Sequence, residues 1–222
     1  YSSLADRGAC IMTIVLSSNP SALTYSDLKT SIANWIHRTD LTSIIPDFIA
    51  DAEIRIYNEL RIRAMEYAFS ETMSNGQIPL PNDFLEWKNL YLNTSPIQKL
   101  DRKSAEWIYQ FYPNRTADGV PKYFTQDNSN LIFAPYPDSD YKVKGTYYRK
   151  FEALSDTVQT NWFTENASDL LRFAALCEAA PYCRDLTITQ VWEQKYEAIK
   201  QRMMRTERRE EFSGSVLTMK AG

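Results

Sequence analysis

Two pairs of closely spaced carboxylates are the residues in this chain best suited to acid–base chemistry: Asp51 with Glu53, and Asp138 with Asp140. A glycan hydrolase needs one carboxyl group as an acid and a second as a base or nucleophile. The first pair falls in a helical pattern and the second in a turn-rich segment, where carboxylates commonly serve the surface or the turn. We therefore expect structural roles for all four, and glycan hydrolysis remains an alternative function.

The other reactive side chains do not form a recognisable catalytic or metal-binding pattern. His37 is the single histidine and falls near the end of a predicted helix. A favourable interaction with the helix dipole is expected there, more than a role as the base of a catalytic triad. Cys10, Cys177 and Cys183 lack zinc spacing, and the last two lie six residues apart, so that we expect no disulfide and a reducing compartment. No phosphate-binding glycine motif occurs. We expect no catalytic residue, no metal and no cofactor.

Composition narrows the function classes further. The chain has 222 residues, of which 44% are apolar, and a net charge of −3. That length supports one core with a modest insertion, and the balanced charge does not indicate a protein that grips nucleic-acid phosphates. No apolar run approaches the roughly 18–20 residues of a membrane span, so no membrane partner is expected.

Helical patterns lie near both ends of the chain. Thr24 and Asp27 resemble a capping box that opens a helix running to about Arg38. A second amphipathic helix is predicted from Ile45 to Phe69, and helical spacing returns from Ser168 to Arg209 with an interruption at Pro181. These apolar stripes must pair with one another to be buried.

Between these helices the pattern indicates strands. Asn75-Gly76 predicts a turn, the residues beyond Trp87 favour a strand, and Ser104 caps a short helix near 104–112. Three aromatic and β-branched runs predict a three-stranded meander: Lys122–Gln126, Leu131–Tyr136 and Tyr141–Arg149. The third run alternates cleanly, which indicates one wet face, and Gly145 within it indicates a bulge or a close backbone contact.

The predicted fold class is therefore α+β: an antiparallel helical bundle formed by N- and C-terminal helices, with an inserted small antiparallel β-sheet. We expect residues 1–23 to be an N-terminal arm or a leader remnant, residues 24–211 a single domain and residues 212–222 a C-terminal arm. Within the domain, 24–72 and 163–211 are expected to be helical and 76–162 to be the β-rich insert.

Two features indicate assembly with other protein surfaces. Fourteen tyrosines and five tryptophans exceed what a monomer of this size needs, and aromatic residues are enriched at interfaces. The C-terminal arm is either an idle terminus or a segment that orders on a partner, and in the second case Phe212, Val216, Leu217 and Met219 would be its apolar anchors. The basic strand face of Lys142, Lys144 and Lys150 is expected to meet solvent or a neighbouring subunit.

A series of segments in this chain resembles, in order, the phage adaptor proteins, which are head-to-tail connectors similar to tail tubular protein A. The segments are Tyr25 to Met65, Leu80-Pro81-Asn82-Asp83-Phe84-Leu85-Glu86, Ala134-Pro135-Tyr136-Pro137, Tyr147-Tyr148-Arg149-Lys150, Leu154-Ser155-Asp156 with Asn161-Trp162, and Ala175 to Tyr182. Together they cover nearly everything from Tyr25 to Met219.

This resemblance implies a structural protein of the virion, assembled in the host cytoplasm, that forms a homo-oligomeric ring of about 12 copies. The ring would join the portal protein to a distal tail or nozzle protein and let double-stranded DNA pass without specific binding. It implies that the C-terminal arm reaches the portal, and we expect Tyr147, Tyr148 and Arg149 to contact neighbouring subunits or the distal tail protein. A tail-associated glycan hydrolase and a transient assembly factor are the alternatives.

Overall fold

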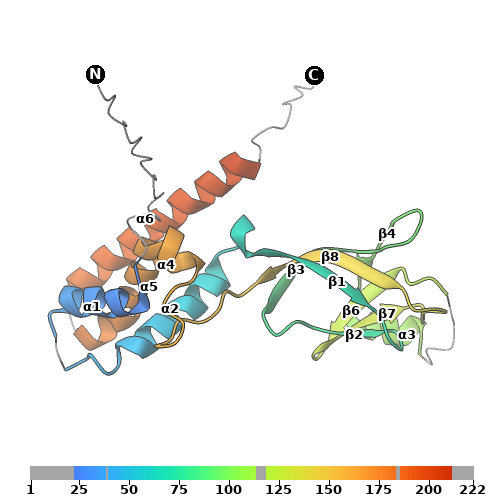
Figure 1. The fold of residues 1–222 in the computed structure, drawn as a ribbon, viewed down its shortest axis with the longest axis horizontal. Coiled ribbons are helices and arrows are strands. Elements are labelled where there is room, and N and C mark those ends of the chain that lie inside the picture. The colour runs from blue at the N-terminus through green and yellow to red at the C-terminus, as the bar shows by residue number, and fades with distance from the viewer. Residues whose placement is uncertain (1–22, 39, 114–118, 184–185, 212–222) are drawn as a thin grey trace, which may run out of the picture.

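A computed structural model describes residues 23–38, 40–113, 119–183 and 186–211 of the chain (Figure 1). The fold is mixed α+β, as predicted. The longer helices gather at one end of an elongated molecule, and two small sheets with one short helix form the other end. Each end has its own buried core.

The helical end is organised around α5 (Ser168–Cys183), which packs against four other helices. These are α1 (Tyr25–Ile36), α2 (Ile45–Glu59), α4 (Trp162–Asn166) and α6 (Leu186–Glu211). A stripe of small residues, including Ala174, Ala175 and Ala179, is completely buried along α5 and allows close helix approach. The longest helix, α6, extends past this core, and its distal part is polar.

Local sequence signals account for the helix ends. The Thr24 side chain accepts a hydrogen bond from the Asp27 N–H while the Asp27 carboxylate accepts one from the Thr24 N–H, which confirms the predicted capping box. His37 closes α1 in the left-handed conformation, with φ of 53°. Pro46 occupies the first turn of α2, where no N–H is needed.

The predicted long helix from Ile45 to Phe69 is wrong in its second half. α2 ends at Glu59, a short 3-10 helix η1 covers Arg63–Met65, and Glu66–Thr72 forms strand β1. In β1 Phe69 is buried, whereas its neighbours on both sides are exposed. The strand forms because β8, more than 70 residues later, pairs with all of it, and local helical spacing could not reveal that partner.

Two four-stranded sheets form the other end. The first has the order β1-β8-β3-β4 and the second the order β2-β7-β6-β5. The bounds are β2 (Gln77–Pro79), β3 (Phe84–Leu92), β4 (Gln98–Lys99), β5 (Asp101–Arg102), β6 (Tyr123–Asp127), β7 (Asn130–Ala134) and β8 (Lys142–Arg149). Helix α3 (Ala105–Phe111) begins after Ser104, whose side chain caps it as predicted.

The predicted three-stranded meander, and with it the single inserted sheet, is wrong. β6 and β7 do form a hairpin, but β8 lies in the other sheet between β1 and β3. In addition, β5 and β6 pair in parallel, so the second sheet is not purely antiparallel. In this position Val143 and Tyr147 of β8 are buried in the core at this end of the molecule, beside Leu131 and Phe133 of β7.

At Gly145 the backbones of β8 and β3 lie in close contact, as predicted from the sequence. A Cβ added there would collide with the backbone carbonyl of Asn89 and lie 2.9 Å from Cδ1 of Leu90. β3 also shifts register against β8 between Trp87 and Asn89, which is the irregularity expected of a bulge. Glycine thus lets β3 and β8 approach.

Across the described helices, none is both long enough and apolar enough to cross a membrane.

Candidate interaction site

The end of β8 lies at the junction between the two ends of the molecule, and it carries the three residues predicted as contacts. Tyr147 points into the sheet core and is only 3% exposed. Its hydroxyl donates a 3.0 Å hydrogen bond to Asp83 Oδ1. Burial, followed by this bond, raises the pKa of Tyr147 to about 12. Tyr147 therefore acts inside the subunit, and little of it is available to a neighbour.

Tyr148 and Arg149 lie differently. Tyr148 is half-buried and packs against the helical core, on the opposite face of the sheet from Tyr147. The guanidinium of Arg149 lies 4.5 Å from the ring centre of Tyr67, which is 49% exposed. Arg149 Nε is buried and makes no hydrogen bond within the described part of the chain. Of the three residues, Arg149 is the best placed for an external contact.

Two adjoining hollows flank this site. One, of about 390 Å³, is lined by Asn82, Asp83, Arg149, Lys150, Phe151 and Glu152. The other, of about 480 Å³, runs along β1 and is lined across from it by Pro79, Leu80 and Pro81. Asp83 in the first hollow bonds to Tyr147 in the second. The first hollow has two basic side chains, Arg149 and Lys150, and two acidic ones, Asp83 and Glu152, so this groove is suited to a polar contact with another protein.

Sequence reasoning missed Tyr67, the partner of Arg149. The segment was expected to be helical, so its side chains were not considered with those of β8. The available signal was the alternation of Tyr67, Phe69 and Glu71, which share one face of β1.

Of the three lysines predicted to lie on one strand face, Lys142 and Lys144 do lie there, whereas Lys150 lies beyond the end of the strand. Lys142 is exposed and Lys144 half-buried, both on the face of β8 opposite to Val143 and Tyr147. Lys150, just beyond the strand, is exposed. The alternation predicted for this strand, with one wet face, is confirmed.

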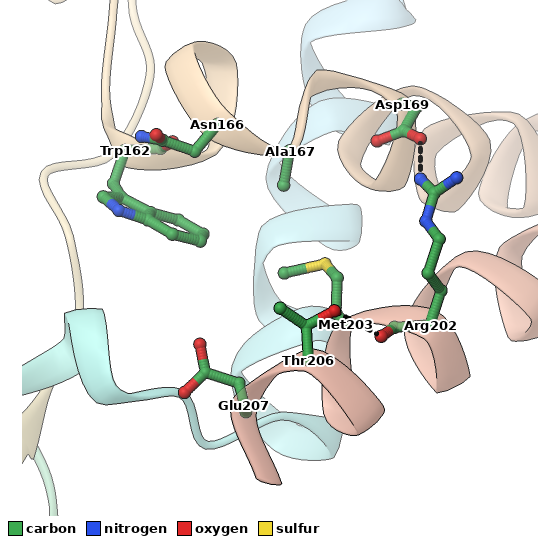
Figure 2. A pocket seen from close by; sticks show the side chains of 8 residues that line it. All are labelled: Trp162, Asn166, Ala167, Asp169, Arg202, Met203, Thr206 and Glu207. Atoms are coloured by element: carbon green, nitrogen blue, oxygen red, sulfur yellow. Dashed lines mark hydrogen bonds and ion pairs between the residues drawn. The ribbon is translucent and has the colours of Figure 1, made fainter. Parts of the chain in front are cut away.

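A separate hollow of about 250 Å³ lies between α4, α5 and the distal part of α6 (Figure 2). Trp162 and Met203 line it with apolar surface, and an ion pair of 2.7 Å between Asp169 and Arg202 closes one side. On the other side the Glu207 carboxylate accepts a 3.0 Å hydrogen bond from the Arg63 N–H. This bond connects the distal part of α6 to the segment that leads into β1.

The two carboxylate pairs are not arranged as a pair of catalytic acids. Glu53 is buried, whereas Asp51 is exposed on α2. Asp138 accepts a 2.6 Å hydrogen bond from the Tyr141 hydroxyl within a turn that also contains Asp140. In the ranges that the structure describes, no group of three histidine, cysteine, aspartate or glutamate side chains could hold a metal ion.

Cys177 and Cys183 are not joined to each other by a disulfide. Burial, together with a hydrogen bond to Glu193, raises the pKa of Cys177 to about 12, so this thiol is unreactive near neutral pH. Cys183 is half-buried. Cys10 and the predicted portal contacts Phe212, Val216, Leu217 and Met219 lie outside the described residues.

Comparison with known proteins identifies one family. The model of the SU10 adaptor protein family matches residues 23–219, which covers both ends of the molecule and most of the C-terminal arm. A search of curated proteins finds no significant match.

Proposed function

This chain belongs to the SU10 adaptor protein family, whose members are structural proteins of phage particles, and from that premise we propose that it is the head-to-tail connector of a virion. In this proposal about 12 copies form a ring on the portal protein. The ring holds the distal tail or nozzle protein and leaves a channel for double-stranded DNA. The observation that carries the proposal is the family match, because it spans 197 of 222 residues, counted from 23 to 219.

The helices near the two chain ends pack on one shared core, and this supports a rigid building block. Pairing of α1 and of α2 with α5 joins segments far apart in sequence. We propose that these helices act as the bundle that holds the ring together. A rigid subunit loses little conformational entropy on assembly, which favours a stable ring.

We propose that the C-terminal arm contacts the portal. α6 extends beyond the helical core and carries a polar surface there, and the arm follows it directly in the sequence. Phe212, Val216, Leu217 and Met219 would then supply apolar anchors.

The groove around Arg149 would contact a neighbouring subunit or the distal tail protein. Tyr148 and Tyr147 would serve chiefly to hold Arg149 in place, because one packs on the helices and the other is buried.

Charge is compatible with a channel for DNA. Each phosphate that a protein neutralises adds affinity that would slow sliding. A subunit with a net charge of −3, repeated around a ring, provides no strong grip. We propose that Lys142, Lys144 and Lys150 face a neighbour or solvent and not the channel.

A symmetry-resolved image of the head-to-tail vertex tests the proposal directly. It should show this chain as a ring between portal and tail, with α6 directed towards the portal. Mass analysis of purified virions should find it in about 12 copies. Absence from finished particles would instead indicate a transient assembly factor, and wall-degrading activity of the isolated protein would indicate a hydrolase.

The arm is tested by deletion of residues 213–222. The shortened chain should fold with unchanged thermal stability but lose attachment to portal-bearing heads. A matched control replaces the arm by a Gly/Ser sequence of the same length, which keeps the length but not the apolar anchors. Undiminished attachment of either variant would contradict the arm contact and leave the ring proposal standing.

A further inference from the structure

Apolar side chains remain exposed around Phe173, where α5 lies between α1 and α6. The Trp35 ring of α1 meets the Phe173 ring edge-on at 5.5 Å, and Nζ of Lys195 in α6 lies 5.6 Å from the centre of the same ring. Trp35, Ile188 and Val191 are 42–44% exposed. Ile188, Val191 and Lys195 are spaced three and four residues apart and so lie on one side of α6. We call Trp35, Ile188, Val191 and Lys195 the α1–α6 face.

The surroundings of the α1–α6 face are net positive. Lys195 pairs with no carboxylate in the described part of the chain and contacts the Phe173 ring instead. Arg202, on the same side of α6, pairs with Asp169 of α5 at 2.7 Å (Figure 2). Arg172 of α5 donates to a serine hydroxyl of α1 at 3.3 Å. Three cations are therefore offset by one carboxylate, and the face suits an apolar partner surface that carries negative charge.

The exposed side of α2 has that character. At three- and four-residue spacing it carries Asp47, Ala50, Asp51, Ile54 and Asn58, and the opposite side of the helix is buried. Ile54 is 58% exposed. Neither Asp47 nor Asp51 forms an ion pair among the described residues. We call these five residues the α2 ridge, which has two carboxylates, an exposed isoleucine and no cation.

The α2 ridge and the α1–α6 face lie on opposite sides of α5. Phe48 of α2 contacts the Tyr182 ring at 5.0 Å, and Arg55 of α2 pairs with Glu178 at 3.4 Å, so α2 covers the side of α5 that carries Glu178 and Tyr182. At about 100° per residue, these two positions lie about 140° and 180° around the helix from Phe173. The exposed α2 ridge points further away from α5 on that side.

This placement decides what kind of contact the two surfaces can make. They cannot meet within one chain, because the body of the helical end separates them. A two-fold dimer uses one self-complementary patch, whereas two different complementary patches on opposite sides of a subunit join copies head to tail and generate a ring when the rotation closes. The charges match in that arrangement, since the ridge is acidic and the face is basic.

We propose that the α2 ridge of one copy packs on the α1–α6 face of the next copy around the ring. Ile54 lies against Trp35 and Val191, and the carboxylates of Asp47 and Asp51 lie beside Lys195. Burial of the apolar side chains supplies most of the affinity, while the charges select the orientation. The inference rests on the proposed connector function, because the occupant is a second copy in the ring, and it assigns the contact to surfaces distinct from the groove around Arg149.

Charge reversal tests the contact. Lys195→Glu places a carboxylate opposite the α2 ridge of the next copy and should lower ring formation on portal-bearing heads at least about tenfold. Asp47→Lys with Asp51→Lys should do the same. All three substitutions in one chain exchange the charges of both surfaces and should restore ring formation. Because the surfaces do not meet within a chain, this rescue can arise only between copies, and its failure would overturn the proposal.

The apolar part of the contact is tested by Ile54→Glu. The side chain is exposed, so the variant should unfold at the same temperature as wild type, yet it should form rings on portal-bearing heads at least about tenfold less well. The matched control is Ile97→Glu, which replaces an isoleucine of the sheet end that is also exposed and should attach normally. Wild-type ring formation by Ile54→Glu would contradict the proposal.

Cross-linking separates a failure of this contact from a failure of the connector function. Ile54→Cys with Val191→Cys, in a chain with Cys10→Ser and Cys183→Ser, should give a ladder of covalent oligomers when purified particles are treated with a short bis-maleimide. The control Ile97→Cys with Val191→Cys should give no ladder. Normal attachment to the portal without a ladder would overturn the contact and leave the connector standing. Absence of the unaltered chain from purified particles would overturn the connector function itself.

Discussion

Oε1 of Glu53, in α2, accepts a 3.0 Å hydrogen bond from Nδ2 of Asn161, which caps α4. The same oxygen accepts the Leu154 N–H at 3.4 Å. One turn further along α2, the Tyr57 hydroxyl accepts from the Phe151 N–H at 3.0 Å and donates to the Phe151 carbonyl at 3.3 Å. These bonds attach the connection between β8 and α4 to α2, and they join the sheet end to the helical end.

Glu53 should make stability depend on pH. Burial raises the pKa of Glu53 to about 7, although the bonds from Leu154 and Asn161 lower it. A raised folded pKa stabilises the protonated form, so this stability is complete below the unfolded pKa of about 4.5 and is lost as pH rises through about 7. We therefore compare the free energy of unfolding of Glu53→Gln with that of wild type at each pH. The difference in favour of the variant should be larger at pH 8 than at pH 4.5 by on the order of 3 kcal/mol.

Urea unfolding at the two pH values measures this difference. The matched control is Asp51→Asn, an exposed carboxylate on the same helix, which should shift stability equally at both. If Glu53→Gln gave the same difference at pH 4.5 and pH 8, the buried carboxylate would not be the titrating group.

Gly145→Ala should destabilise the sheet end by about 1–3 kcal/mol, because the new methyl group would meet the Asn89 carbonyl and Leu90. The neighbouring Thr146→Ala, on the opposite face, should cost well under this. Denaturant unfolding of both variants compares them. A Gly145→Ala protein as stable as wild type would show that β3 and β8 can separate freely.

Arg55 connects three helices. Its guanidinium pairs with Glu59 of α2 at 3.0 Å, with Glu178 of α5 at 3.4 Å and with Glu193 of α6. It also lies 4.5 Å over the Tyr196 ring. Arg55→Ala leaves partly buried carboxylates without a cation, and we expect a loss of about 1–3 kcal/mol in the free energy of unfolding.

Arg55→Lys should recover only part of the loss, since an ammonium group cannot replace the planar fork. Asp40→Ala, which breaks the exposed pair with Arg38, is the control and should cost at most about 0.5 kcal/mol. Equal effects of Arg55→Ala and Asp40→Ala would mean that the three-helix network adds nothing beyond a surface pair.

Arg149→Ala should weaken assembly more than it weakens the fold. Arg149 contacts the Tyr67 ring within the subunit, so the folded chain loses little. If the groove binds a neighbour, loss of this arginine should lower ring formation on portal-bearing heads at least about tenfold, or about 1.4 kcal/mol. Arg102→Ala, an exposed arginine on β5, should attach normally. Attachment of Arg149→Ala at the wild-type level would remove this residue from the interface.

Much of the local structure follows from local signals. The capping box at Thr24, Pro46 in the first turn of α2, the Asn75-Gly76 turn and the Ser104 cap all lie as predicted. Each depends on side chains within a few residues, so a short stretch of sequence contains the whole interaction. The candidate site could be predicted only in part. The strand β8 and the alternation of its faces could be predicted from the sequence, whereas the contact of Arg149 with Tyr67 could not.

The sequence by itself determined the fold class, the helix starts, the wet and buried faces of β8 and the likeness to phage adaptors. Only the tertiary structure decided that Glu66–Thr72 is a strand, that β8 leaves the β6–β7 hairpin, and that Glu53 is buried. The physical reason is that these outcomes depend on partners far away in the chain. A strand such as β1 is stabilised by hydrogen bonds and packing that exist only after β8 has returned beside it.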